Sequence, residues 1–446
     1  MANLILPLIS SILLLVLFTF LLWRRLKQNL FLELGFLYLS FIVIYTIAPG
    51  IGLIFIELNP SLNVGMMITN YLDSNIVDLS FHLWRHFLFG FSFSLSYYLF
   101  RGSSQIVVSK IDQRETLSIY LLISIIIFSF LLLFLLSAPV DGYLENYTRY
   151  EHLPNYLRIF VSLIIRFKAG FYTILLTLLF AQYRSKKTLI LFVVLTLCAL
   201  EILYSYGSRI YSFVILLQVF FLYSYFVKAL SIKRVLISIV FLLTLFSVIE
   251  IVRLQDVKST GLKSSLDDKT IGLPTELGAV FIPSFLLYQE REQNTLPKRD
   301  WQMFFYDFIS PFTRNSDTKW NPMWWYANNY YPKSEVPPFT LGPIAESAIW
   351  GGEFDLILRG FLNGVFFATI VKWFIRRRQK FWAVSVYVYC FSFAVITVKY
   401  SIFFYLTPFL KELLPTILIA KLLIFIVLAI FNGNSKLNSK SIRTIN

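Results

Sequence analysis

Apolar runs of about 20 residues recur from one end of this chain to the other, and they constrain its fold more than any other feature. An α-helix of that length crosses the hydrocarbon core of a bilayer and satisfies its own backbone hydrogen bonds. A membrane β-barrel would need alternating polar and apolar residues, whereas these runs are continuously apolar. The sequence therefore predicts an all-α polytopic membrane protein.

We expect about eleven spans, a number that follows from the length a helix needs to cross the bilayer. They cover 4–23, 30–56, 81–100, 117–138, 157–182, 188–205, 210–227, 235–252, 354–373, 381–398 and 414–431. No basic residue precedes the first run, whereas Arg24 and Arg25 follow it, so we interpret it as a retained helix and not as a cleaved signal peptide.

The basic residues indicate the orientation of these spans. They gather in alternate connections, at 24–27, 101–114, 184–187, 228–234 and 372–380, and again in the tail after 435. Since basic residues favour the cytoplasmic side, the pattern predicts an N-terminus outside and a C-terminus inside. The net charge of +15 is thus a topology signal, and we expect no nucleic-acid partner.

One outer connection, residues 253–353, is far longer than the others and divides the chain. We expect spans one to eight in 1–252, an extracytoplasmic loop in 253–353, and the last three spans with a basic cytoplasmic tail in 354–446. Long loops without a function of their own are uncommon. We expect short helices in this loop, lying over the membrane face.

The loop is rich in aromatic residues. They are Trp301, Phe304, Phe305, Tyr306, Trp320, Trp324, Trp325, Tyr326, Tyr330, Tyr331 and Phe339. Aromatic faces suit the C–H faces of sugars, so Trp324 and Trp325 are candidate glycan contacts. The alternative is that Trp and Tyr are enriched at any membrane interface.

Several kinds of chemistry are missing from the sequence. It contains no phosphate-binding P-loop, no dinucleotide fingerprint, no H-E-x-x-H and no G-x-S-x-G. A cytoplasmic D-x-D pair, which a metal-dependent enzyme using nucleotide sugars would need, is also missing. The two cysteines lie inside apolar runs and do not indicate a disulfide framework. We therefore expect no metal and no cofactor.

The fifth span carries ionisable residues at positions where they are costly and usually functional. Arg158, Ser162 and Arg166 follow a helical i, i+4, i+8 stripe, and Lys168 lies two residues beyond it. The Arg158 side chain can extend to the lipid headgroups. Arg166 lies about 13 Å along the helix, which is too deep for its side chain to reach them easily. Arg166 and Lys168 are candidate ligands of a lipid phosphate.

A second candidate group follows the sixth span, in the short turn from Tyr206 to Arg209. Backbone N–H groups that open a helix, together with an arginine fork, suit a phosphate. Arg253, at the end of the eighth span, emerges on the same outer face and follows Glu250 at the spacing of a local ion pair. A headgroup contact would explain Arg209 equally well, and a local ion pair with Glu250 would explain Arg253.

Two further features flank the outer face. His82 and His86 are spaced to share a metal on one helix face, but a third ligand is lacking, so we interpret them as amphipathic side chains at the membrane interface. Glu346 precedes a span from the outside and could act as a general base, an arginine's partner or a helix-start charge.

These residues resemble motifs of the O-antigen polymerases (Wzy type), also known as oligosaccharide repeat-unit polymerases. The resemblance is carried by Ser205-Tyr-Gly-Ser-Arg209 before a span, Arg253 before a long outer loop, Phe308-Ile-Ser-Pro-Phe-Thr-Arg314, and Leu341-Gly-Pro-Ile-Ala-Glu346 through Gly352. It covers the chain in layout, most clearly over 157–375.

The resemblance implies a metal-independent glycosyltransferase of the membrane-embedded class C type, in the bacterial inner membrane. It would transfer a growing chain from undecaprenyl pyrophosphate to a new lipid-linked repeat unit at the outer face, in lipopolysaccharide or other polysaccharide biosynthesis. Arg209 and Arg253 would stabilise the leaving pyrophosphate and Glu346 would accept a proton. Arg166, Lys168, Arg314 and Tyr206 would bind the lipid-linked glycan, and a chain-length regulator is an expected partner.

Two alternatives remain open at this point. An O-antigen ligase would share the architecture and the donor but use another acceptor. A flippase would favour paired, Gly/Pro-interrupted helices, of which only Pro49-Gly50 offers an example.

Overall fold

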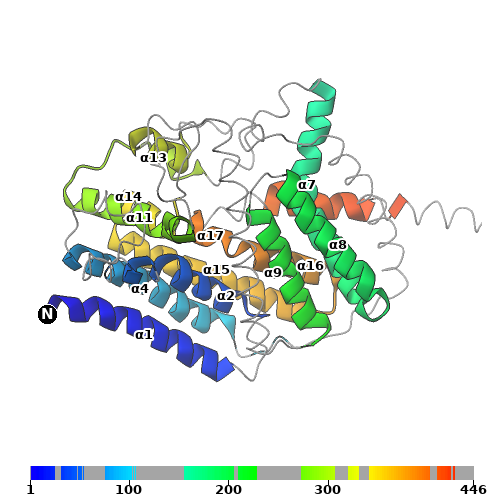
Figure 1. The fold of residues 1–446 in the computed structure, drawn as a ribbon, viewed down its shortest axis with the longest axis horizontal. Coiled ribbons are helices and arrows are strands. Elements are labelled where there is room, and N and C mark those ends of the chain that lie inside the picture. Colours follow the sequence, from blue (N-terminus) through cyan, green and yellow to red (C-terminus); the bar gives the residue numbers. More distant parts are fainter. Residues whose placement is uncertain are drawn as a thin grey trace, which may run out of the picture.

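A computed structural model of the chain describes residues 2–25, 32–47, 49–52, 54, 76–102, 104, 106, 155–204, 209–228, 273–306, 320–330, 341–401, 409–422 and 425–426. These residues form helices and no strand (Figure 1). The elements are α1 (Ala2–Arg25), α2 (Leu34–Ile42), the π-helix η2 (Val43–Ile47), α4 (Ile76–Arg101), α7 (Asn155–Ala181), α8 (Tyr183–Tyr204), α9 (Arg209–Phe226), α11 (Leu273–Glu292), the 3₁₀ turn η3 (Trp301–Met303), α13 (Pro322–Tyr330), α14 (Pro343–Ile349), α15 (Glu353–Arg377), α16 (Phe381–Phe393), α17 (Ile396–Lys399) and the π-helix η6 (Phe409–Leu413).

Three stretches in the described part of the chain are long and apolar enough to cross a membrane, namely Leu34–Gly52, Glu353–Arg377 and Phe381–Lys399. Shorter apolar helices cover Ile9–Phe20, Phe167–Ala181 and Ser212–Phe226. The all-α class is confirmed, and the helices are compatible with a membrane protein. The count of eleven stays a prediction, because the expected spans at 117–138 and 235–252 lie outside the described residues.

Helices α4 and α15 share the most extensive interface among the described elements. On α15 the interface uses Gly360 and Gly364, the G-x-x-x-G spacing that lets two helices approach closely in a membrane. A Cβ added to Gly360 would lie 2.7 Å from the carbonyl oxygen of Phe89. Ser92 Oγ donates to the carbonyl oxygen of Ile357 at 2.7 Å across the same contact. Close packing thus fixes the start of α15 beside α4.

Helices α1, α4 and α15 run in the same direction, side by side (Figure 1). Their basic C-terminal ends, at Arg25, Arg101 and Arg376, therefore lie at one end of the bundle. Glu33, just before α2, forms a buried ion pair with Arg101, so α2 starts at that end and runs the opposite way. Helices α1, α2, α4 and α15 thus have the relative directions expected of predicted spans one, two, three and nine.

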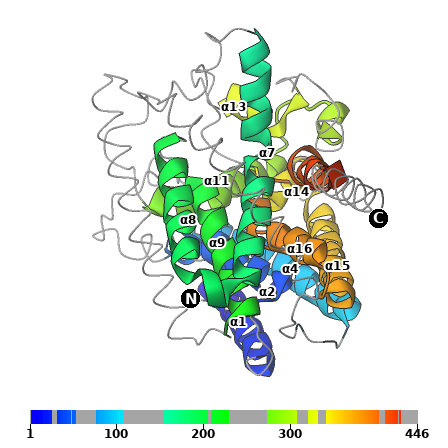
Figure 2. The same ribbon diagram turned by 90° about the vertical axis from the view of Figure 1, so that its right-hand side faces the viewer.

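The remaining long helices, α7, α8, α9 and α16, pack against one another beside this group (Figure 2). Gln218 of α9 joins three of them, since its Nε2 donates to Thr173 Oγ1 of α7 at 2.8 Å and to Ser392 Oγ of α16 at 3.3 Å. In a bilayer the hydrophobic effect does not drive helices together, because the lipid tails are themselves apolar. Buried hydrogen bonds of amide and hydroxyl groups such as these help to hold the helices together instead.

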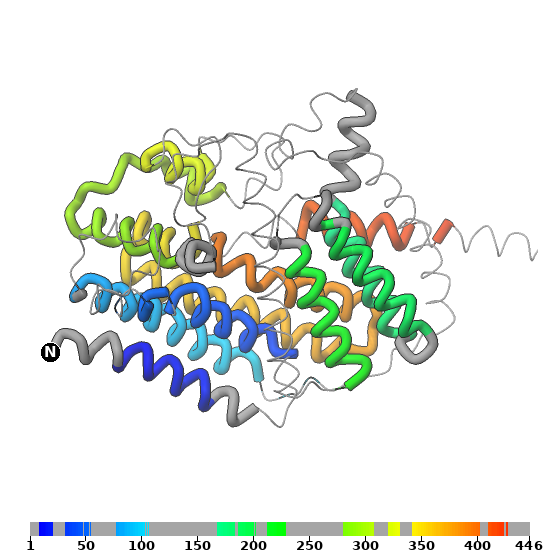
Figure 3. The backbone as a smooth tube through the Cα atoms, viewed as in Figure 1, coloured from blue at the N-terminus to red at the C-terminus, as the bar shows by residue number. Residues whose placement is uncertain are grey.

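The segment expected to be a loop with short helices contains a twenty-residue helix, α11. Phe281 and Phe285 of α11 are buried against Leu79 and Leu83 of α4, and α11 also contacts η2 and α14. Pro283 and the flanking charges interrupt the apolar pattern, which hides the helix in the sequence. Figure 3 follows the chain from the end of α11 round to η3. This segment therefore contributes to the packed core.

Candidate functional site

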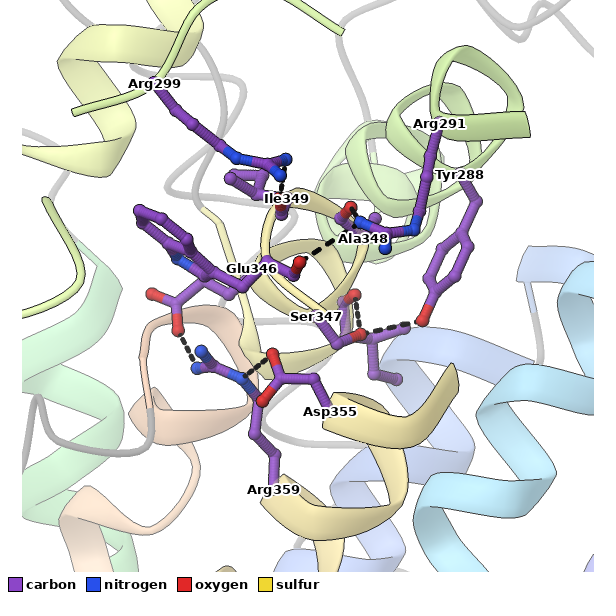
Figure 4. A network of polar contacts seen from close by, with 11 residues as sticks. Tyr288, Arg291, Arg299, Glu346, Ser347, Ala348, Ile349, Asp355 and Arg359 are labelled. Atoms are coloured by element: carbon purple, nitrogen blue, oxygen red, sulfur yellow. Dashed lines mark hydrogen bonds and ion pairs between the residues drawn. The ribbon is translucent and has the colours of Figure 1, made fainter. Parts of the chain in front are cut away.

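The candidate site is built around α14, a helix of seven residues that are all buried. It lies where α11 meets the starts of α4 and α15 (Figure 4). Gly342 caps its N-terminus, and a Cβ there would overlap the carbonyl oxygen of Val398 in α17. Only glycine therefore lets the chain enter α14 so close to α17.

Glu346 of α14 belongs to a buried triad with two residues of α15. Arg359 donates through Nη1 to Glu346 Oε2 and through Nε to Asp355 Oδ2, the latter at 2.8 Å. The side chains of Glu346, Asp355 and Arg359 are 7%, 14% and 6% exposed. One guanidinium faces two carboxylates, so the triad carries a net charge of −1 when all three are ionised.

Two further arginines bind the opposite side of α14, at its C-terminal carbonyl groups (Figure 4). Arg291 Nη1 donates to the carbonyl oxygens of Ala348 and Trp350, at 2.9 and 3.3 Å, and Arg299 Nη1 donates to that of Ile349. Burial, and then the like charge of Arg291, lower the pKa of Arg299. The two guanidiniums are thus close enough to repel each other.

Arg85 of α4 connects α11 and α15 beside α14. It pairs with Glu292 of α11 and with Glu353 of α15, and its guanidinium lies 4.3 Å from the ring centre of Tyr288. Tyr288 and Ser347 share a hydrogen bond of 2.8 Å between their hydroxyls. Burial raises the pKa of Tyr288 to about 12, so this hydroxyl remains protonated at neutral pH.

The interpretation of His82 and His86 as interface side chains is wrong, because both imidazoles are fully buried. His82 Nε2 lies 2.9 Å from Ser284 Oγ and 3.0 Å from His86 Nε2. The ring of His86 stacks on Phe281 of α11. The helix that the loop contributes encloses the pair, and the sequence does not reveal that helix.

Lys168 of α7 lies apart from α14, in a buried ion pair with Glu201 of α8 at 2.8 Å. Tyr172 also hydrogen-bonds Glu201, at 3.1 Å. The structure thus gives Lys168 a partner within the bundle. Arg166 belongs to α7 and Arg209 begins α9, but both side chains lie outside the described part of the structure.

Replacing Lys168 with methionine should lower the free energy of unfolding by about 3–5 kcal/mol, because it leaves the Glu201 carboxylate buried without its cation. Denaturant unfolding of the purified protein in detergent measures this. Adding Glu201→Gln to the same chain should recover most of the loss. Unchanged stability in the single variant would contradict a structural role for the pair.

The other candidates are divided between described and undescribed residues. Trp324 and Trp325 lie on α13, where Trp325 is buried and donates from Nε1 to the carbonyl oxygen of Lys298 at 3.0 Å. Trp324 is half-buried. Tyr206, Arg253 and Arg314 lie outside the described residues. Their expected roles remain predictions.

Sequence reasoning missed most of the charged residues around α14. Asp355 and Arg359 were detectable, since they are ionisable residues four apart inside a predicted span. Arg291 and Arg299 carried no such signal. They lie in a polar stretch, and only the path of the chain brings them to α14.

Comparison of the chain with protein-family models, curated proteins and solved structures found no match.

Proposed function

We propose that this protein is a membrane-embedded glycosyltransferase that polymerises lipid-linked oligosaccharide repeat units at the outer face of the bacterial inner membrane. The donor would be a glycan on undecaprenyl pyrophosphate, and the acceptor a hydroxyl of the next lipid-linked unit. The proposal needs neither nucleotide nor metal.

The observation that carries the proposal is the placement of Glu346. The fold brings it to the end of the bundle opposite the basic ends of α1, α4 and α15, in a triad with a net charge of −1. Arg359 is shared between Glu346 and Asp355, so within the triad one guanidinium faces two carboxylates. A carboxylate in this position can act as a general base.

The proposed reaction uses this carboxylate as a general base. The Glu346 carboxylate takes the proton of the acceptor hydroxyl as the acceptor oxygen bonds to the anomeric carbon of the donor. The bond from that carbon to the pyrophosphate oxygen breaks, and the electron pair leaves with undecaprenyl pyrophosphate. Arg209 and Arg253 are proposed to stabilise the negative charge of the leaving group.

The aromatic surroundings of the triad support a glycan acceptor. The guanidinium of Arg359 lies 5.8 Å from the ring centre of Phe304, and Phe304 packs edge-on against Trp350 with ring centres 5.4 Å apart. Aromatic rings beside a carboxylate suit the mixed apolar and hydroxyl surface of a sugar. In this proposal Lys168 does not bind the substrate. It has a structural role, through its ion pair with Glu201 between α7 and α8.

The test is reconstitution of the purified protein with a lipid-linked repeat unit. Products that lengthen by whole repeat units, without nucleotide or divalent cation, would support the proposal. Transfer of a single unit to a lipid A-type acceptor, without lengthening, would favour a ligase instead. Movement of the lipid-linked unit across a vesicle membrane without any new glycosidic bond would favour a flippase.

A further inference from the structure

We propose that Arg291, Arg299 and Trp301 form a subsite for a sugar that carries an anionic group. This inference rests on the proposed function, for which it names a substrate class: acidic repeat units. The shared chemistry is an oxyanion attached to a sugar ring, either the carboxylate of an acidic sugar or a sugar phosphate. We take the acidic sugar as the ligand, and the experiment below separates it from a phosphate.

The first argument is an excess of positive charge. The C-terminus of a helix carries about half a unit of negative charge, and one basic side chain satisfies it. Here two guanidiniums bind the C-terminal carbonyls of a seven-residue helix. Within the described ranges neither Arg291 nor Arg299 has a carboxylate at ion-pair distance. About 1.5 units of positive charge therefore remain for a ligand.

The second argument is the unused hydrogen-bonding capacity of the two arginines. A guanidinium has five N–H donors in a planar fork that matches a carboxylate or phosphate. Arg291 and Arg299 each use only Nη1 on α14. Across the structure's described part, the Nε and Nη2 groups of both have no hydrogen-bond partner. Since Arg299 lies at the surface, its fork is accessible to a ligand.

The third argument is the aromatic surface beside these donors. The guanidinium of Arg299 lies 5.6 Å from the ring centre of Trp350, which packs against Trp301 with ring centres 5.5 Å apart. The side chain of Trp301 is 73% exposed, an unusual state for so large an apolar ring. A flat exposed indole next to a cationic fork offers a sugar both a stacking face and a partner for its charge.

The subsite is held by contacts that fix its backbone. Trp325 of α13 binds the carbonyl oxygen of Lys298, directly before Arg299. Asp300 caps η3 by accepting from the backbone N–H of Gln302 at 3.0 Å, and the buried Met303 anchors the turn. Asp300 is thus engaged in positioning Trp301.

Gly352 positions the other arginine. Its φ is +64°, a left-handed conformation that favours glycine. A Cβ there would lie 2.8 Å from Nε of Arg291, so glycine makes the room in which this guanidinium reaches α14. Two separate segments, the end of α11 and the turn before α15, therefore converge to place Arg291.

The experiment measures binding to the full-length protein in detergent at low ionic strength. The probes are trigalacturonate, the neutral maltotriose of equal length, and inorganic pyrophosphate. We expect trigalacturonate to bind at least about tenfold more tightly than maltotriose, since a charge-assisted fork is gained. Added salt should reduce the difference.

Two substitutions and two matched controls test the residues. Arg299→Gln and Trp301→Ala should each weaken trigalacturonate binding by about tenfold. Lys298→Gln removes the neighbouring exposed charge, and Phe354→Ala removes another exposed ring, 79% exposed. Both controls should bind like the parent protein. Arg299→Lys, which keeps the charge without the fork, should fall between the parent and Arg299→Gln.

Three outcomes would overturn the inference. These are equal binding of maltotriose, equal loss in Lys298→Gln and Arg299→Gln, or Arg299-dependent binding of pyrophosphate without binding of trigalacturonate. Binding needs no turnover, so the two proposals fail separately. A protein that binds trigalacturonate yet never lengthens a lipid-linked glycan would refute only the polymerase.

Discussion

Replacing Arg359 with methionine should lower the free energy of unfolding by about 3–5 kcal/mol, one of the largest effects expected of any single substitution in this protein. The change keeps the length and apolar stem of the side chain but removes the only guanidinium of the triad. Glu346 and Asp355 would then be two largely buried carboxylates that have lost the guanidinium they share. Helix α14 would also lose its ion pair to α15.

Arg85→Met is the matched control for this prediction. Arg85 also bridges two carboxylates at the same end of α15, but Glu292 and Glu353 are 58% and 55% exposed. Water can solvate them when the arginine is removed, so the loss should be about 1 kcal/mol or less.

Denaturant unfolding of both variants in the same detergent compares them directly. Adding Glu346→Gln and Asp355→Asn to Arg359→Met should restore most of the stability, because the buried charges are then gone. Equal stability of Arg359→Met and Arg85→Met would contradict the claim that the buried triad stabilises the fold more than the exposed ion pairs of Arg85 do.

Predicted spans with long apolar runs coincide closely with helices of the structure. Helix α15 covers Glu353–Arg377 where a span at 354–373 was expected, and α16 with α17 covers Phe381–Lys399 where 381–398 was expected. Length and hydropathy determine such helices locally. Helix α11 could not be predicted in this way, since its burial depends on contacts with α4, η2 and α14 that its own sequence does not encode.

The site was less predictable than the fold, for a related reason. Glu346 was identified from its position before a span, but its partner Arg359 lies thirteen residues away on another helix. Sequence spacing indicates pairs on one helix, such as Asp355 with Arg359, and gives no information on pairs between helices. Arg291 and Arg299 meet α14 across some fifty residues of chain, so only the fold reveals them.

The carboxylates of the triad differ in the role we propose for them, and the same small change in each separates those roles. Glu346→Gln should lower the rate of repeat-unit transfer by about 10²–10⁴-fold, the range that a general base contributes. The glutamine side-chain oxygen still accepts a hydrogen bond from Arg359, so α14 should stay in place. What the amide loses is the capacity to take a proton from the acceptor hydroxyl.

Asp355→Asn makes the equivalent change on the other side of the same guanidinium. If Asp355 only shares the charge of Arg359, its variant should keep the rate within about tenfold of the parent, well above that of Glu346→Gln. Initial rates with a lipid-linked repeat unit, together with unfolding midpoints for both variants, provide the comparison. Equal rate losses that follow the loss of folded protein would assign Glu346 a structural role like that of Asp355, and the base would then have to be another residue. A rate loss confined to Glu346→Gln, with both variants equally stable, would instead identify Glu346 as the group that contacts the acceptor.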